Sequence, residues 1–128
     1  MATVERIDRD LPTAPCRSCG VASPRDSGGR RVILDLAPTG ADGPREIHLR
    51  YSKHVCPACK VTFNCDMTDI APEGGRYTHR VREVGLRLLR RPGVSLRGAA
   101  AELRRRHGVA ISVASLHAWA RADSAERG

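Results

Sequence analysis

Aromatic side chains are scarce in this sequence: Tyr51, Phe63, Tyr77 and Trp119 make up only 3% of its residues. A chain with so few of the large side chains that fill protein interiors is not expected to build one large hydrophobic core. Small domains of this kind need a bound metal or disulfides for stability. The 128 residues give room for one domain or for two small ones.

Long apolar runs are also missing. No stretch approaches the roughly 18 apolar residues of a transmembrane helix, and the N-terminus has acidic residues where a secretory signal would have an apolar segment. We therefore expect no contact with membranes and a cytoplasmic location. In that reducing compartment, closely spaced cysteines are expected to bind metal rather than to form disulfides.

Motifs of catalytic sites are absent as well. The sequence has no Gly-rich phosphate loop and no H-E-x-x-H motif. The aspartates at 35, 42, 66 and 69 are scattered over a predicted strand, a turn and a linker, so they do not form the carboxylate pair of a two-metal nuclease. We expect that the protein is not an enzyme.

Four of the five cysteines form two C-x-x-C pairs, Cys16/Cys19 and Cys56/Cys59. Each pair curls the backbone so that both sulfurs face one point, and two such knuckles can bind one tetrahedral zinc ion. All four ligands come from the protein, so the predicted zinc is structural, and its binding energy of about 10–16 kcal/mol becomes folding energy. The sequence leaves open the roles of Cys65, His48 and His54.

The segment between the knuckles alternates apolar and polar residues. Arg30 to Leu36 and Glu46 to Val55 are predicted strands, separated by the turn-rich segment Pro38 to Pro44, and Val61 to Phe63 is a short third strand. We expect a zinc ribbon over residues 12–65, which contains a loop at 23–29. A flexible N-terminus at 1–11 precedes the ribbon. Residues 66–75 are predicted to be a linker.

Helical periodicity begins at Arg76. The first predicted helix ends at Pro92-Gly93, the second is capped by Ser95 and ends at Gly108, and the third is capped by Ser112. The last two helices and their connection are typical of a helix-turn-helix, so residues 76–122 are predicted to be an all-α three-helix unit and residues 123–128 a disordered tail. The fold class is small α+β.

Positive charge is concentrated in the helical segment. Residues 1–75 are neutral, with ten basic and ten acidic residues, whereas residues 76–122 hold eleven arginines and two glutamates. This distribution favours double-stranded DNA as the partner. The residues expected to contact phosphates are Arg80, Arg87, Arg91, Arg97, Arg104 and Arg105. The residues expected to face the groove are Ser112, Ser115, His117 and Arg121.

The motif order is C-x-x-C-G, two strands, C-P-x-C-K-x-T-F, R-Y-T-x-R-V-R-x-x-x-L-x-L, S-L-R-x-A-A-x-x-L and G-V-x-I-S-x-x-S-L-x-x-W. Over residues 16–121 this order resembles the zinc-ribbon and helix-turn-helix DNA-binding region of bacterial insertion-sequence transposases, in a short form without the catalytic domain. The resemblance implies recognition of terminal inverted repeats during transposition and DNA recombination. It also implies that DNA cleavage, where it occurs, belongs to a separate catalytic chain.

Two kinds of function remain open on the sequence alone. The first is DNA binding, by a transposase-like module or by a stand-alone transcription regulator at inverted repeats or an operator. The alternative is a zinc-ribbon adaptor that binds other proteins of a transcription or recombination complex, through the neutral first half of the chain. The DNA target and the oligomeric state, a dimer included, are also open.

Overall fold

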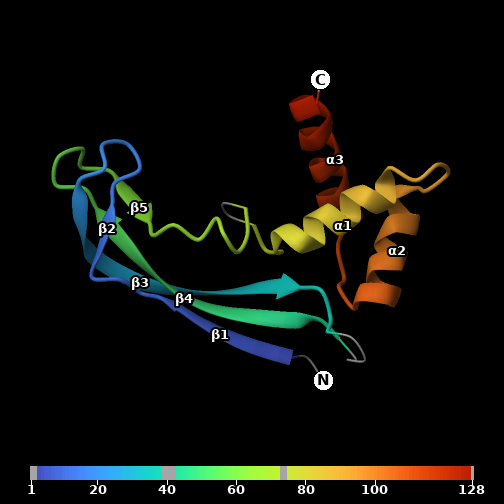
Figure 1. Ribbon diagram of the computed structural model, residues 1–128, viewed down its shortest axis with the longest axis horizontal. Helices are drawn as coiled ribbons and strands as arrows, with labels where there is room; N and C mark the ends of the chain where they lie inside the picture. The colour runs from blue at the N-terminus through green and yellow to red at the C-terminus, as the bar shows by residue number, and fades with distance from the viewer. Residues whose placement is uncertain (1–2, 39–42, 73–74, 128) are drawn as a thin grey trace.

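The structure, a computed structural model, describes residues 3–38, 43–72 and 75–127. In these ranges a β-sheet half is followed by three helices, which confirms the predicted small α+β class. The strands are β1 (Thr3–Arg9), β2 (Thr13–Pro15), β3 (Ala22–Asp35), β4 (Arg45–Val55) and β5 (Thr62–Asn64). The helices are α1 (His79–Leu89), α2 (Leu96–His107) and α3 (Val113–Arg127). Figure 1 shows an elongated molecule with the cysteine knuckles at one end of the sheet and the helices at the other.

The sheet is built on the antiparallel pair β3–β4. Its register runs from Arg25↔His54 at the knuckle end to Asp35↔Arg45 at the helical end, with a bulge between Arg25 and Ser27. On its other edge β4 pairs in parallel with β1 and, farther along, antiparallel with β5. The short β2 pairs with the start of β3. Each knuckle therefore connects two antiparallel strands, β2 to β3 and β4 to β5.

Two segments that the sequence predicted to be irregular form strands. The predicted flexible N-terminus is wrong for Thr3–Arg9, which is strand β1 beside β4, and the predicted loop at 23–29 belongs to β3. Pairing with β4 explains both, because a polar segment with little propensity of its own becomes a strand when its backbone completes a sheet. Gly29 also lies opposite Tyr51, where an added Cβ would come within 2.5 Å of the phenol ring.

The prediction of a disordered tail at 123–128 is wrong for residues 123–127, because α3 continues to Arg127. Asp123 is bound at 3.0 Å to Arg90, the C-cap residue of α1, which ties this last part of α3 to the end of the first helix. Residue 128 lies outside the described residues, as do residues 39–42 of the predicted turn.

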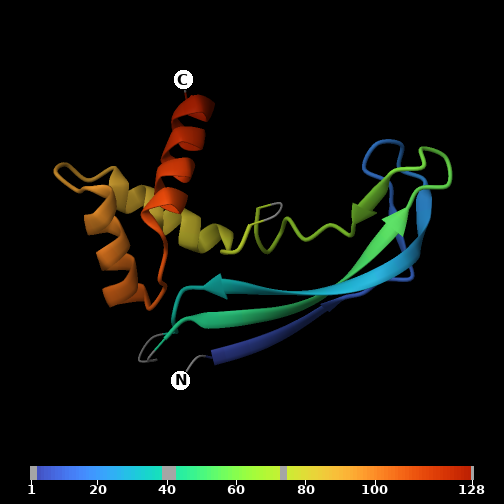
Figure 2. The ribbon, with the colours of Figure 1, turned by 180° about the vertical axis from the view of Figure 1, so that it is seen from behind.

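The predicted linker covers one face of the sheet. Met67 and Ala71 are buried against Ile33, Ile47 and Leu49, which point to the same side of β3 and β4. Figure 2 shows the linker following the sheet from β5 to α1. The first hydrophobic core therefore lies between one face of the sheet and the linker, whose described residues form no helix or strand of their own.

The helices form a second core around Val81, Ala99, Leu103 and Leu116. Gly85 of α1 allows close approach to α3, since a Cβ there would lie 3.1 Å from Leu116 Cδ2. The predicted N-cap of α2 is confirmed, because the Ser95 side chain accepts a hydrogen bond from the backbone N–H of Gly98 at 3.0 Å. None of the helices in the described part of the chain has the length and apolar character that a membrane crossing requires.

A buried aspartate joins the sheet to the helices. The Asp35 side chain is completely buried at the end of β3, and its Oδ1 accepts a hydrogen bond of 2.7 Å from Thr78, the N-cap of α1. Its other oxygen is bound by the guanidinium of Arg80 and lies 3.5 Å from that of Arg45. The neighbouring backbone continues the junction, because Leu34 pairs with Tyr77 in a parallel bridge.

A second junction joins the sheet half to the connection between α2 and α3. The backbone N–H of Ala37 donates to the carbonyl oxygen of His107 at 2.8 Å, which fixes the end of α2 against the chain that follows β3. Gly108 then ends α2 with φ of 67°, as the sequence predicted. A Cβ on Gly108 would lie 2.9 Å from Ala37 Cβ. Glycine is therefore required here by both the left-handed backbone and the close contact with the sheet half.

We expect Asp35→Asn to destabilise the chain by about 3 kcal/mol, because it removes the buried carboxylate that Arg80 binds and that lies near Arg45. The measurement is the free energy of unfolding in urea with metal bound. Asp26→Asn is the matched control, since Asp26 is exposed on the same strand. Equal stability of the two variants would contradict the role of Asp35 at this junction.

Two glycine substitutions separate the cost of a left-handed backbone from the cost of a clash with the sheet half. Gly93→Ala is expected to cost about 1 kcal/mol, because Gly93 has φ of 79° but an added Cβ would meet no atom within 4 Å. Gly108→Ala should cost clearly more, because it adds the clash with Ala37. Thermal unfolding of both variants is the measurement. A Gly108→Ala protein as stable as Gly93→Ala would mean that the connection from α2 to α3 does not pack on the sheet half.

Candidate metal centre and basic helical surface

The two knuckles have the same backbone hydrogen bonds. In the first, the N–H of Cys16 donates to the Val21 carbonyl at 3.0 Å and the N–H of Gly20 donates to the Cys16 carbonyl at 2.8 Å. In the second, Cys56 and Lys60 make the matching bonds at 3.0 and 2.9 Å. Gly20 has φ of 76°, and Lys60 at the equivalent position has φ of 63°. The second knuckle thus adopts the same left-handed turn with a lysine in place of glycine.

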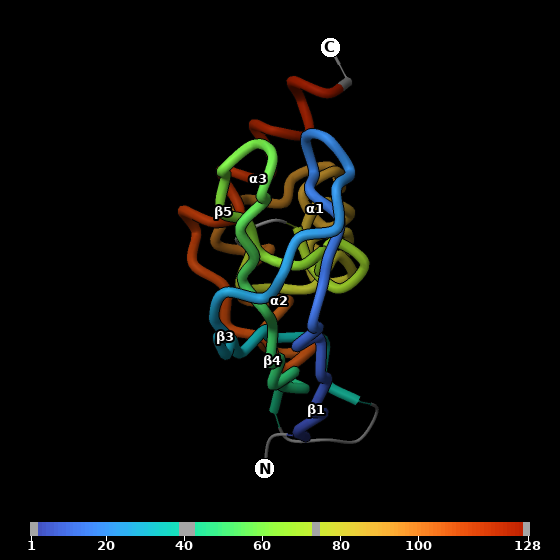
Figure 3. Tube along the Cα trace, turned by 90° about the vertical axis from the view of Figure 1, so that its left-hand side faces the viewer, coloured from blue at the N-terminus to red at the C-terminus, as the bar shows by residue number. Residues whose placement is uncertain are grey.

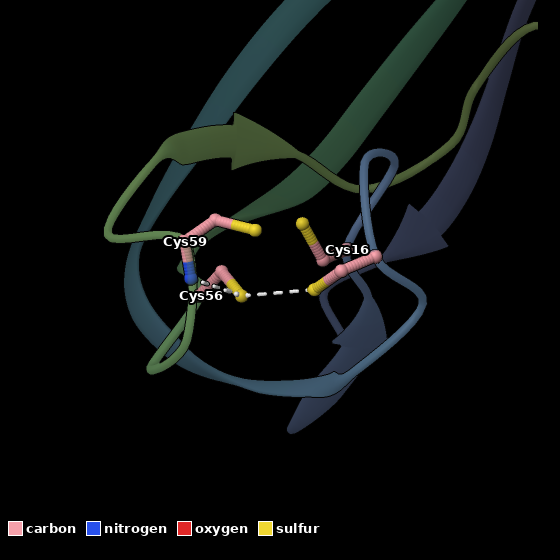
Figure 4. A group of neighbouring side chains, drawn as sticks. Cys16, Cys56 and Cys59 are labelled. Carbon is pink, nitrogen blue, oxygen red and sulfur yellow. Dashed lines mark hydrogen bonds between the residues drawn. The ribbon is translucent and has the colours of Figure 1, made fainter.

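These turns bring the four thiols together. The Sγ atoms of Cys16, Cys19, Cys56 and Cys59 all lie within 4.8 Å of one another. Figure 4 shows the labelled Cys16, Cys56 and Cys59 pointing toward one another. The Sγ atoms of Cys19 and Cys56 are 3.5 Å apart. A tetrahedral zinc–thiolate site with bonds of about 2.3 Å has sulfur–sulfur edges of about 3.8 Å. The donor set and its spacing therefore fit a metal ion such as zinc.

The pKa values of the thiols show how closely they interact. The pKa of Cys56 is lowered to about 6, chiefly because the backbone N–H of Cys59 donates to its Sγ at 3.2 Å. The pKa of Cys59 is raised to about 12, first by its hydrogen bond with Cys19 and then by burial and the other thiols. Four neighbouring thiols cannot all ionise without a cation, because each thiolate disfavours the next. A divalent ion at the centre removes this repulsion.

The cluster can bind a metal ion, but it would leave no free coordination position on that ion. Cys16 and Cys56 are buried at 3% and 0% exposure, whereas Cys19 and Cys59 lie at the surface. Four protein sulfurs complete a tetrahedral coordination shell, so no position remains for a water molecule or a substrate. The arrangement suits a structural metal that fixes the two knuckles to each other.

The three residues with open roles lie outside this cluster. Cys65 is buried and its Sγ lies 3.2 Å from the Arg9 carbonyl oxygen. His54 is buried between the Ser52 hydroxyl at 2.7 Å and the Ser23 carbonyl at 3.0 Å, and His48 contacts Glu46 at 3.0 Å. His54 therefore joins β4 to the start of β3 next to the knuckles, a structural role that its sequence position did not indicate.

The predicted phosphate-contacting arginines do not share one environment. Arg80 is bound to the buried Asp35, so its guanidinium belongs to the junction. Arg105 hydrogen-bonds Glu102, and this bond is the largest cause that lowers the pKa of Glu102, with smaller contributions from Arg106 and Arg91. The remaining predicted arginines are exposed, and the described residues provide no ion pair for any of them. These are Arg87, Arg91, Arg97 and Arg104.

The predicted groove-facing residues lie on α3 and at its start. Ser112 caps α3, since its Oγ accepts a hydrogen bond from the N–H of Ser115 at 3.1 Å and lies 2.9 Å from the Ser115 hydroxyl. His117 and Arg121 are exposed on α3, whereas Leu116 is fully buried in the helical core. Figure 3 shows the helices beyond the sheet when the molecule is viewed from the knuckle end. The basic helical surface and the cysteine cluster are therefore separate sites.

Comparisons with known proteins add no further assignment: no protein family, curated protein or solved structure matches this chain. The metal centre and the helical surface are therefore interpreted from their own geometry.

We expect Cys56→Ser to reduce bound zinc from one equivalent per chain to near zero and to unfold the knuckle end, because a serine hydroxyl does not replace a thiolate ligand. Zinc content is measured by atomic absorption after dialysis. Cys65→Ser is the matched control, since Cys65 is buried near the sheet but lies outside the cluster. Loss of zinc in the control, or its retention in Cys56→Ser, would contradict the four-cysteine site.

Proposed function

We propose that this chain is a DNA-binding protein in which a structural zinc ion holds the knuckles and the three helices bind double-stranded DNA. The observation that carries the proposal is the pair Arg97 and Arg104 on α2. These residues are seven positions apart on one helix, so they share a face, and both are exposed without an ion pair among the described residues. Unpaired arginines on one face are suited to consecutive phosphates.

In this proposal α3 is the helix that enters the major groove. Its start is capped by Ser112, and His117 and Arg121 are exposed farther along the helix, which supports a helix-turn-helix. Between Val113 and Ala122 the other exposed positions of the helix are small or apolar, so few side chains there can read base edges. Affinity then comes mainly from phosphates, with modest sequence discrimination. The resemblance to short transposase DNA-binding regions suggests inverted repeats or an operator as the target.

Arg104→Gln is expected to weaken binding to all duplex sequences about equally and to reduce the slope of log K against log salt by about 0.9, the value of one phosphate contact. Fluorescence anisotropy with duplex DNA between about 50 and 200 mM salt measures both quantities. Lys53→Gln is the matched control, because it removes the same charge from the sheet half. A weakening confined to one DNA sequence would place Arg104 at a base edge instead.

The adaptor function has one observation in its favour. Val21 and Val61 follow the two knuckles at equivalent positions and are 39% and 43% exposed, which leaves apolar side chains at the knuckle tips. A protein that binds duplex DNA weakly and without salt dependence would support the adaptor in place of DNA binding.

A further inference from the structure

The sheet has a second face that no described segment covers. Along β1, β4 and β3 alternate residues point away from the linker, and the register places Arg6 beside His48 and Val32, and Asp8 beside Arg50 and Arg30. We call this set the open face. Its six side chains line a hollow of about 450 Å³. Val32 is 52% exposed, so an apolar side chain lies open to solvent among the charged ones.

The charges on the open face are only partly balanced. Arg50 lies 3.3 Å from Asp8 and 3.5 Å from Asp10, and His48 lies 3.0 Å from Glu46. Arg6 and Arg30 have no ion pair with any residue of the described ranges. These two arginines stand on opposite sides of β4, one on β1 and one on β3. The open face therefore has a paired guanidinium group, that of Arg50, between the unpaired guanidinium groups of Arg6 and Arg30.

The spacing of the two unpaired arginines indicates what they can bind. Adjacent strands are about 4.8 Å apart, so Arg6 and Arg30 are separated across the sheet by two strand spacings, about 10 Å. Two arginine side chains on separate strands at this spacing can contact one phosphate or two neighbouring phosphates, so the pair suits a nucleic-acid backbone. The hollow has no aromatic residue, so of the residue types that dominate the centre of protein–protein interfaces it offers only arginine.

The open face also adjoins the helical surface. The hydrogen bond from Ala37 to His107 fixes the end of α2 next to the end of β3. Arg104, Arg105 and Arg106 lie in the last turn of α2, directly before that bond. Figures 1 and 2 both show this end of α2 reaching the helical end of the sheet. The last turn of α2, which carries these three arginines, therefore lies beside the helical end of the sheet.

We propose that the open face is a second phosphate-binding surface, on which Arg6 and Arg30 bind the backbone of a DNA duplex that the three helices hold. This inference rests on the proposed DNA-binding function and extends it. It assigns the sheet half a role in binding, on a duplex that is longer than the helices alone can cover.

The test compares duplexes of two lengths. The full chain with zinc bound is titrated with duplexes of about one helical turn (~10 base pairs) and about three turns (~30 base pairs). The Arg6→Gln/Arg30→Gln variant should bind the short duplex as the unaltered protein does. For the long duplex, its salt slope should fall by about 1.8, which corresponds to two phosphate contacts. The hydroxyl-radical footprint on the long duplex should shorten.

The controls separate the two proposals. Lys53→Gln removes a charge from the opposite side of β4 and should leave the binding of both duplexes unchanged. Zinc content and circular dichroism establish that the double variant is folded. If Arg104→Gln weakens binding while Arg6→Gln/Arg30→Gln binds the long duplex with unchanged slope and footprint, the open face is not a DNA surface although the proposed function stands. If the unaltered protein binds neither duplex, both proposals fail.

Discussion

The antiparallel pairing of β3 with β4 is the constraint on which the rest of the molecule depends. At one end of this pair the strands lead into the two knuckles, and the register between Arg25 and His54 sets the distance between the cysteine pairs. At the other end, Asp35 opposite Arg45 receives Thr78 and Arg80 from the helical half. A shift of register by one residue would turn every side chain to the opposite face, and both ends would lose their partners.

This arrangement explains why a chain with so few aromatic residues has two small cores. The sheet core is covered on one side by the linker, and the helical core is closed by short aliphatic residues with Trp119 at its edge. Neither core is large, so polar interactions carry part of the stability. The thiol cluster fixes the knuckle end, and the buried carboxylate of Asp35 fixes the helical end.

Local sequence signals predicted the local structure well. The two C-x-x-C pairs indicated the thiol cluster, and Ser95, Gly108 and Ser112 indicated helix boundaries, because each of these signals depends on a few neighbouring residues. Residues whose roles depend on distant partners were missed. Nothing near Arg80 in the sequence shows that its partner is Asp35, and the polar alternation of β1 becomes a strand only beside β4. The open face was missed for the same reason, because its arginines come from strands that are far apart in the sequence.

In the proposed function the knuckle end is structural and the basic surfaces bind the partner. Both depend on one structural claim, that β3–β4 pairing delivers four cysteine sulfurs to one ion. X-ray absorption at the zinc edge tests this claim directly on the purified chain. We predict a shell of about four sulfur atoms at about 2.3 Å and no nitrogen or oxygen ligand. A shell that contains a nitrogen or oxygen ligand at about 2.0–2.1 Å would contradict the claim.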